Sequence, residues 1–457
     1  MTEHRGLMAR LMAPVDIAWL AAFRVLYGLL MFAGITRFVL SGWVEVLYVE
    51  PQLHFKYPGF EWVTSWPGWG MYVHFGALAM LALMVALGLF HRVAAPLFTL
   101  GFAYVQLIDV TNYLNHYYLA VLLGALLSVM PAHRAWSLDA VRAPRLRQEA
   151  VPAWMLLLLR FQIAVVYLYA GLAKVGGDWL LHAQPLNLWL AARTEAALFG
   201  PLLAQRWTPH LMSWAGFLFD TTIVLWLSLA RTRPFAYAVL LCFHIATGML
   251  FDIGLFPFIM TVAALLFFPP DWPRSLLRLA PATLPRCLPL GGRLSRSIGL
   301  AAVAGYCVLQ VLVPLRHYAY PGNVLWNEDG MRFSWKVMVR EKHGSVTYRV
   351  RDRVSGRQLQ VTPSEYLTPR QEGEMSSQPD LILQLAHHIC DDFARRGGDV
   401  EVRAQALVSL NGRRAAQLVD PDVDLATLEV SFRPSWWVAA EPSSVPIQLS
   451  AARLPRR

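Results

Sequence analysis

Lys174 is the side chain of this sequence with the clearest capacity for chemistry. It ends an apolar run that begins near Val151 and is long enough to cross a bilayer, so we expect it where hydrocarbon gives way to headgroups. A lysine at this depth can snorkel, with its stem along the helix and its ammonium in water. Alternatively, burial can lower its affinity for a proton and make it a base. The position alone leaves both interpretations open.

Two other polar residues share a predicted helix face with Lys174. Arg160, Tyr167 and Lys174 are spaced by seven residues, and on a straight helix that spacing drifts by only about 20° per step. The stripe they form must face protein or a wet cavity, because lipid offers no partners for these groups. The stripe favours a chemical role for Lys174 over snorkelling.

Three residues from other apolar segments are expected at the depth of Lys174. Asn115 and His116 begin one segment, and His244 lies near the outer end of another. An amine, two imidazoles and a carboxamide under apolar walls have the composition of a proton-transfer pocket. For each histidine alone, the competing interpretation is a structural hydrogen bond to a neighbouring helix.

A deeper polar set consists of Arg24, Arg160 and Asp220. An arginine in mid-membrane is tolerated when a carboxylate neutralises it, so we predict that Arg24 or Arg160 pairs with Asp220 and ties helices together. We assign this set a structural role. The sequence contains no residue spacing typical of a metal site.

The elements that position these residues are membrane helices. Of the 457 residues, 56% are hydrophobic and only 15% are charged, unlike an ordinary soluble domain. Loops on one side of the predicted spans hold most of the arginines, among them Arg92, Arg134 and Arg231, so the positive-inside rule places that side and the N-terminus in the cytoplasm. The net charge of +10 is thus a topology signal and does not indicate nucleic-acid binding. The nine predicted spans are residues 15–40, 70–90, 94–110, 113–131, 153–173, 210–230, 235–251, 253–269 and 298–315.

After Leu315 the long apolar runs end, and the sequence pattern becomes that of short strands and an amphipathic helix. Alternation over residues 345–351 and 358–361 predicts a hairpin, residues 380–396 an amphipathic helix, and Asn411-Gly412 the turn of a second hairpin. An odd number of spans places this part outside the cytoplasm. We therefore predict an all-α multi-pass domain of about nine transmembrane helices at residues 1–315 of a cell (inner) membrane protein, followed by a small α+β extracytoplasmic domain at residues 316–457.

A series of motifs runs in order along nearly the whole chain. In the membrane part they are Ala22-Phe-Arg-Val-Leu-Tyr-Gly28, Asn115-His-Tyr-Tyr-Leu119, Ala170-Gly-Leu-Ala-Lys174, Cys242-Phe-His244, Ile253-Gly-Leu-Phe-Pro257 and Phe268-Pro-Pro-Asp-Trp-Pro273. In the C-terminal part they are Phe333-Ser-Trp-Lys-Val-Met338, Val346-Thr-Tyr-Arg349 and Asp420-Pro-Asp-Val-Asp424. As a series they are specific, and the chain resembles the vitamin K-dependent γ-glutamyl carboxylase family.

The resemblance implies a reaction and roles for particular residues. In that family a lysine takes a proton from vitamin K hydroquinone, the anion adds O2, and the oxygenated product removes a proton from the γ-carbon of a glutamate, which then adds CO2. Lys174 matches that lysine, Asn115 and His116 match the family's Asn-His pair, and His244 matches the histidine near the quinone. Met338 is similar to a methionine that lines the family's pocket.

The resemblance also implies the co-substrates and partners. We expect a vitamin K hydroquinone (a menaquinol-type quinol), O2 and CO2 as co-substrates, with no metal. Trp335 and Met338 are expected to contact the quinone together with Tyr167. The expected partners are a lipid quinone, membrane lipid and a polypeptide that carries glutamate.

Two other functions fit the same sequence. One is an enzyme of the same family that oxygenates the quinol to its epoxide without carboxylating a peptide. The other is a non-catalytic helical bundle that handles a lipid or a solute, in which the polar residues only tie helices together.

Overall fold

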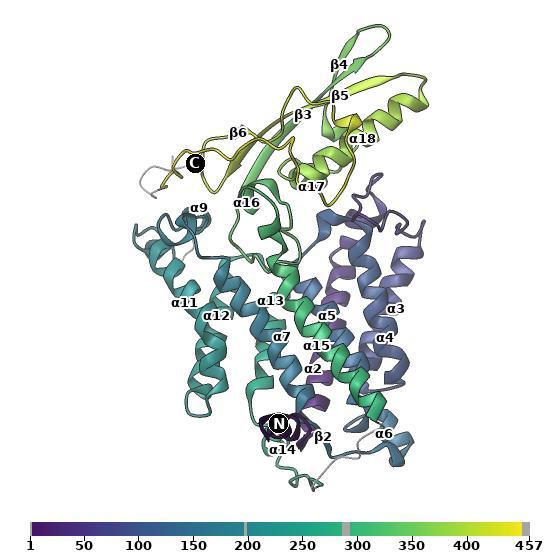
Figure 1. The fold of residues 1–457 in the computed structure, drawn as a ribbon, viewed down its shortest axis with the longest axis vertical. Coiled ribbons are helices and arrows are strands. Elements are labelled where there is room, and N and C mark those ends of the chain that lie inside the picture. The colour runs from purple at the N-terminus through teal and green to yellow at the C-terminus, as the bar shows by residue number, and fades with distance from the viewer. Residues whose placement is uncertain (1, 196–198, 286–292, 450–457) are drawn as a thin grey trace.

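The computed structural model describes residues 2–195, 199–285 and 293–449 of the chain. Figure 1 shows a bundle of long helices with a smaller region of strands and helices on one end, called the C-terminal region here. The N-terminal helix α1 (Thr2–Leu11) lies at the opposite end of the bundle.

Each of the nine predicted spans overlaps a helix. These are α2 (Ala18–Leu40), α3 (Gly70–Leu87), α4 (His91–Ile108), α5 (Asn115–Val129), α7 (Ala153–Leu172), α11 (Thr208–Ser228), α12 (Arg233–Leu250), α13 (Phe256–Ala264) and α15 (Arg293–Leu315). Short helices connect them or lie in the C-terminal region: α6 (Leu138–Arg142), α8 (Gly177–Leu180), α9 (Leu186–Ala191), α10 (Gly200–Leu203), α14 (Trp272–Leu276), α16 (Val324–Asn327), α17 (Pro369–Met375) and α18 (Pro379–Arg395).

Within the described part of the chain, six helices are long and apolar enough to cross a membrane. They are α2, α3, α7, α11, α12 and a helix over Ser297–Ala319 that contains most of α15. The predicted number of nine spans is therefore not confirmed. The 15 residues of α5 rise only about 22 Å at about 1.5 Å each, whereas the hydrocarbon core is about 30 Å thick. α13 and its 3-10 extension, which ends at Phe267, are shorter still.

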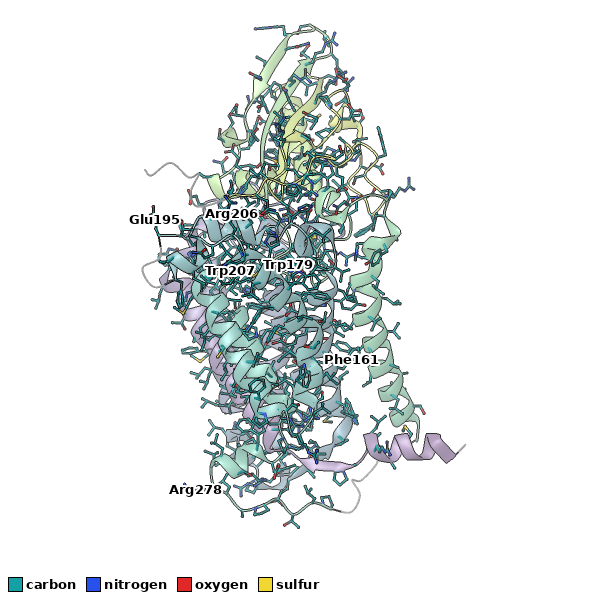
Figure 2. All side chains as sticks on the ribbon, turned by 90° about the vertical axis from the view of Figure 1, so that its left-hand side faces the viewer. Phe161, Trp179, Glu195, Arg206, Trp207 and Arg278 are labelled. Carbon is teal, nitrogen blue, oxygen red and sulfur yellow. The ribbon has the colours of Figure 1, made fainter. Side chains whose placement is uncertain are left out.

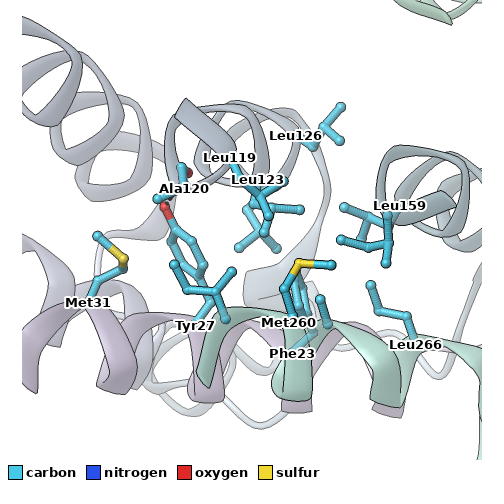
Figure 3. Close-up of a cluster of buried hydrophobic side chains, with 14 of the residues drawn as sticks. Phe23, Tyr27, Met31, Leu119, Ala120, Leu123, Leu126, Leu159, Met260 and Leu266 are labelled. Atoms are coloured by element: carbon cyan, nitrogen blue, oxygen red, sulfur yellow. Dashed lines mark hydrogen bonds between the residues drawn. The ribbon is translucent and has the colours of Figure 1, made fainter. Parts of the chain in front are cut away.

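The centre of the bundle is an apolar core shared by α2, α5, α7 and α13. Phe23 and Tyr27 of α2 lie between leucines of α5 and Met260 of α13 (Figure 3). The hydroxyl of Tyr27 donates to the carbonyl of Ala120 at 2.7 Å, so its one polar atom is satisfied inside the core. At the next residue, a Cβ on Gly28 would lie 2.5 Å from the backbone nitrogen of Ala86, so the contact between α2 and α3 requires glycine there.

The C-terminal region is built on a four-stranded antiparallel sheet. Its strands are β3 (Lys342–Asp352), β4 (Gln358–Val361), β5 (Val400–Leu410) and β6 (Ala416–Gln417), in the order β4-β3-β5-β6. In the central pair Tyr348 lies opposite Ala404, and its hydroxyl donates to the carbonyl of Ile382 in α18 at 2.9 Å. The two predicted hairpins and the amphipathic helix are thus confirmed.

A separate two-stranded sheet in the bundle pairs β1 (Pro14–Asp16) with β2 (Ala150–Pro152) at the N-terminal end of α7.

Polar contacts on two sides help to fasten the C-terminal region to the bundle. The side chain of Gln371 donates to Asp109, which follows α4, at 2.9 Å. On the other side Asp178 in α8 accepts two bonds from Arg413, at 2.6 and 2.7 Å, and one from Asn411 at 2.9 Å. The division into domains at residue 315 stays a prediction, and residues 450–457 of the second predicted domain lie outside the described range.

Figure 2 places Trp179 in the half of the bundle nearest the C-terminal region and Arg278 at the far end. The loop after Lys174 therefore lies beside the C-terminal region, as the predicted topology requires. The apolar helices indicate a membrane protein. Which end faces the cytoplasm stays a prediction.

Candidate active site

Lys174 follows the end of α7, and its ammonium is held by Asp220 of α11. The Nζ atom lies 2.7 Å from Asp220 Oδ2, donates to the carbonyl of Ala170 at 3.1 Å, and lies 5.0 Å from the centre of the Trp179 ring. The two charged side chains are only 6% and 8% exposed. In this structure the ammonium is paired inside the protein and does not snorkel to water.

The predicted pairing of Arg24 or Arg160 with Asp220 is therefore wrong. Arg24 donates to three carbonyls within residues 132–136, just after α5, at 2.5–3.1 Å. Arg160 donates to the carbonyls of Leu266 and Phe268, at the end of α13, at 2.7 and 3.0 Å. Free carbonyls at and just after helix ends can thus accept hydrogen bonds from a guanidinium without a carboxylate, although Arg24 Nε has no partner among the described residues.

Asp220 reaches Lys174 because α7 and α11 approach closely. A Cβ at Gly171 would lie 2.6 Å from Cγ2 of Thr221 and 3.1 Å from its backbone nitrogen. At Gly216, one helical turn before Asp220, the nearest atoms to a Cβ would be Trp179 Cζ2 at 3.6 Å and Lys174 Cε at 4.0 Å. Small residues permit such close contacts between membrane helices. The glycine within the Lys174 motif is the sequence signal from which this contact could have been predicted.

A cavity of about 80 Å³ lies beside the ion pair; we call it the first cavity. Its walls are mostly apolar and come from α7, α9, α11, α12, α13 and the segment before β3. Its ionisable lining residues are Lys174, Asp220, Tyr167 and His244. Met338 lies on the wall contributed by the C-terminal region. The first cavity therefore offers an apolar enclosure with a small polar corner.

Tyr167 and His244 form the second polar pair of this corner. The Tyr167 hydroxyl lies 3.0 Å from His244 Nε2, and both side chains are buried. Among the described residues, His244 Nδ1 has no hydrogen-bond partner. A buried ring nitrogen without a partner is costly, so this atom is available to a ligand.

The other predicted site residues lie outside the first cavity. The ring of Phe256, 6.3 Å from each histidine ring between centres, lies against both His116 and His244. His116 does not line the first cavity, so the structure does not bring all three predicted proton-transfer residues into one chamber. Trp335, predicted to contact a quinone, lines neither cavity described here; it is fully buried and stacks on Tyr118 at 5.0 Å.

Asn115 lies in a second cavity, of about 200 Å³, between the bundle and the C-terminal region. Met338 lines both cavities and is the only residue that their walls share within the described parts of the chain. The second cavity is polar, and its charged lining residues are Glu328, Arg332, Lys336, Arg340 and Glu374. No sequence pattern predicted this cavity, because its cations come from a segment without regular structure.

The cations of the second cavity differ in their partners. Arg332 is paired with Asp380 at 2.6 Å, and Arg340 with Glu328. Among the described residues Lys336 has no carboxylate partner, and burial lowers the pKa of its ammonium. Lys336 is therefore the cation of this cavity that remains for a bound anion.

The segment that carries Lys336 and Met338 has an unusual backbone. Phe333, Trp335 and Met338 all have left-handed backbone angles, with φ between 55° and 63°. Such angles cost free energy for residues other than glycine and persist where the surrounding packing demands them. The segment is thus held in one shape between the two cavities.

Comparison with known proteins covers most of the chain. The family model of the HTTM domain matches residues 12–272, and that of the vitamin K-dependent gamma-carboxylase lumenal domain matches residues 295–444. The first match contains Lys174, Asp220 and His244, and the second contains Lys336 and Met338. No solved structure matches the chain.

Proposed function

Since this chain belongs to the vitamin K-dependent gamma-carboxylase family, with its HTTM and lumenal domains in order, we propose that it is an integral-membrane enzyme coupling vitamin K hydroquinone oxygenation to glutamate carboxylation. The observation that carries this proposal is the buried pair of Lys174 and Asp220 in an apolar cavity. That cavity meets a cation-lined one at Met338. Two substrates of opposite polarity can thus be held side by side.

The first cavity fits the ring of a hydroquinone. Its apolar walls suit the ring, and Tyr167, Lys174 and the unpartnered His244 Nδ1 suit the phenolic hydroxyls. A bound hydroquinone supplies the electrons that reduce O2. Apolar walls also exclude water from the reaction.

Lys174 takes the hydroquinone proton in this scheme, which requires a neutral amine. Asp220 provides a way to obtain one, because a proton moving from Nζ to Oδ2 over 2.7 Å leaves a neutral amine and a neutral carboxyl group. No net charge is then created in the bundle, and the amine can accept the next proton.

The second cavity receives the glutamate side chain. Lys336 neutralises its carboxylate, and Asn115, which accepts a hydrogen bond from Tyr113 at 3.0 Å, keeps its amide group available as a donor. His116 packs against Phe256, which lines the first cavity, and so supports that wall. The glutamyl γ-carbon would thus approach the first cavity at Met338.

The decisive experiment measures both products on the same protein. Purified protein in detergent is incubated with vitamin K hydroquinone, labelled bicarbonate and a short peptide containing glutamate, and epoxide and fixed label are followed together. We expect both products from the wild type and from the control Gln205→Ala, an exposed position outside both cavities. Epoxide without fixed label would favour an epoxidase, and the absence of both would favour the non-catalytic bundle.

Replacing Lys336 tests the assignment of the second cavity. Lys336→Ala removes the free cation, so we expect the KM for the glutamate peptide to rise about ten- to a hundredfold, as for a lost hydrogen bond to a charged group. Epoxide formation without peptide should be unchanged, and Lys336→Arg should recover most of the affinity. An unchanged KM in Lys336→Ala would remove this residue from the acceptor site.

A further inference from the structure

A short segment near the end of the described chain is held by two amide side chains of the bundle. Gln184 donates to the carbonyl of Ile447 at 2.7 Å. Asn187 donates to the carbonyl of Leu449 at 3.0 Å and accepts from the nitrogen of Leu449 at 2.8 Å. Gln184 is fully buried and Asn187 is 5% exposed. Residues 445–449, called the strap segment here, are therefore bound by the amide of Gln184, in the loop between α8 and α9, and by that of Asn187 in α9.

The strap segment is enclosed from the other side by the turn between β5 and β6. The nitrogen of Ile447 donates to the carbonyl of Gly412 at 3.0 Å. Gly412 has a φ of +78°, and a Cβ there would lie 3.5 Å from both Gln184 Nε2 and Ile447 Cγ1. The turn is itself fixed by Asp178 through Asn411 and Arg413. The strap segment thus lies in a slot with a rigid wall on each side.

The slot recognises main chain far more than side chains. Its bonds go to the backbone at Ile447 and Leu449, two residues apart, which is the repeat of an extended chain. The side chains of Val445 and Ile447 are 70% and 53% exposed. Pro446 is buried, Leu449 is half-buried, and the side chain of Gln448 donates to the carbonyl of His182 at 2.8 Å. A slot of this kind accepts many extended sequences.

The slot also adjoins both cavities. Leu186, the neighbour of Asn187, lines the first cavity, and Asn411 in the turn beside the strap segment donates to the carbonyl of Val339, which lines the second cavity, at 3.3 Å. We propose that Gln184 and Asn187 form a docking site for an extended polypeptide, the acceptor of carboxylation, which the strap segment occupies until it is displaced. This inference rests on the proposed function for the identity of the acceptor. The binding site itself can be tested without any turnover.

Tethering determines how strongly the strap segment competes. A segment attached by a short flexible linker has an effective concentration on the order of millimolar at its site. A free polypeptide must compete with the strap segment present at that effective concentration. Removal of the strap segment should therefore increase the apparent affinity of the slot for a free peptide. The gain is at least about tenfold if the free peptide binds with a Kd below about 0.1 mM.

The first experiment measures peptide binding by fluorescence anisotropy. The probe is a fluorescein-labelled peptide with the sequence of residues 443–449, and the proteins are the full chain and a variant that ends at Ser444. We expect the peptide to bind the shortened variant at least tenfold more tightly than the full chain. Adding Asn187→Ala to the shortened variant should abolish most of this gain in affinity, whereas adding the control Gln205→Ala should leave the affinity unchanged. Equal affinity of the peptide for both proteins, or an affinity that Asn187→Ala does not change, would overturn the proposal.

The second experiment keeps the chain at full length, in case the shortened variant does not fold. Asn187→Cys with Leu449→Cys places two thiols where the bidentate amide contact lies, and oxidation locks the strap segment in the slot. We expect the oxidised protein to lose at least tenfold in kcat/KM for a long glutamate peptide, to retain epoxide formation without peptide, and to recover on reduction. The single-cysteine variants are the controls.

The outcomes separate this inference from the proposed function. Equal carboxylation by the oxidised and reduced forms would overturn the docking site while leaving the enzyme assignment intact. A wild type that fixes no label would instead contradict the proposed function. In that case the anisotropy measurement alone decides whether the slot binds an extended peptide.

Discussion

The ion pair of Lys174 and Asp220 combines a structural and a chemical role in one contact, and paired substitutions can separate the two. Lys174→Ala leaves the buried carboxylate of Asp220 uncompensated, which should cost on the order of 3–5 kcal/mol. Lys174→Ala combined with Asp220→Ala removes both charges and should recover most of that loss. Neither protein should form epoxide, because neither has the base. Thermal unfolding in detergent and product analysis measure the two effects.

A different result at this pair would contradict its proposed roles. If the double variant were as unstable as the single one, packing and not the charge would explain the loss. If either variant formed epoxide at the wild-type rate, Lys174 would not be the base. Lys174→Arg is the matched control, since it keeps the charge but cannot give up its proton.

Lys342 of β3 predicts a pH dependence of stability. Its side chain is 1% exposed, and burial lowers the pKa of its ammonium to about 8, against the opposing effect of Glu328 at 3.2 Å. The unfolded chain keeps that proton up to its ordinary pKa near 10.5, so between pH 8 and 10.5 the unfolded state binds more protons than the native state. Stability should therefore rise with pH in this window relative to Lys342→Met. The difference in melting temperature between the two proteins, followed from pH 7 to pH 10, measures the effect.

The difference in stability between wild type and Lys342→Met below pH 8 is the internal control for this titration. Below pH 8 both states of the wild type hold the proton, so the difference between wild type and Lys342→Met should be constant there. A difference that stayed constant up to pH 10 would mean that Lys342 keeps its ordinary pKa. Glu328 remains paired with Arg340 throughout, so loss of the lysine charge does not leave the carboxylate alone.

Among elements, the contact between α7 and α11 determines whether Lys174 meets Asp220. Gly171→Ala forces a Cβ to within about 3 Å of Thr221 and must push the helices apart, which should cost about 1–3 kcal/mol and most of the activity. Gly216→Ala is the matched control. Its Cβ would make ordinary contacts at 3.6 Å or more, and alanine favours the helix by up to about 1 kcal/mol. Melting temperatures of the two variants in detergent measure the difference, and equal values would contradict the close helix contact.

Sequence periodicity predicted the elements well and the contacts between them poorly. Apolar runs and strand alternation are local properties, so helices appear at all nine predicted spans and both hairpins form where expected. The number of membrane crossings also depends on helix length. α5, with 15 residues from Asn115 to Val129, is shorter than its predicted span and too short to cross the hydrocarbon core. The partners of Arg24 and Asp220 depend on which helix ends meet, and no local pattern carries that information. Lys174 and His244 line the same cavity, whereas His116, predicted at the same depth, does not line it.

At the scale of the molecule, the contact of Asp178 with Arg413 fastens the C-terminal region beside the candidate active site. Arg413→Ala removes two charge-assisted bonds, so local opening should become about ten- to a hundredfold more frequent. Arg414→Ala, an exposed neighbour with the same change of charge, is the control. Hydrogen exchange in the turn between β5 and β6 and in α8 measures the opening. Equal protection in the two variants would show that Asn411 and apolar packing hold the region without Arg413.

The position of Met338 in the chain also has a consequence for synthesis. Val337 and Met338 complete the wall of the first cavity, but they follow every helix from α2 to α15, and Arg413, which fastens their region, comes later still. At about 5–20 residues per second, a ribosome needs on the order of ten seconds to proceed from α13 to Arg413. A nascent chain therefore contains Lys174 and Asp220 before it has a closed chamber. If Lys174 acts as proposed, the reaction can begin only after the segment with Met338 has been made, so a shorter nascent chain would not expose a reactive intermediate to water.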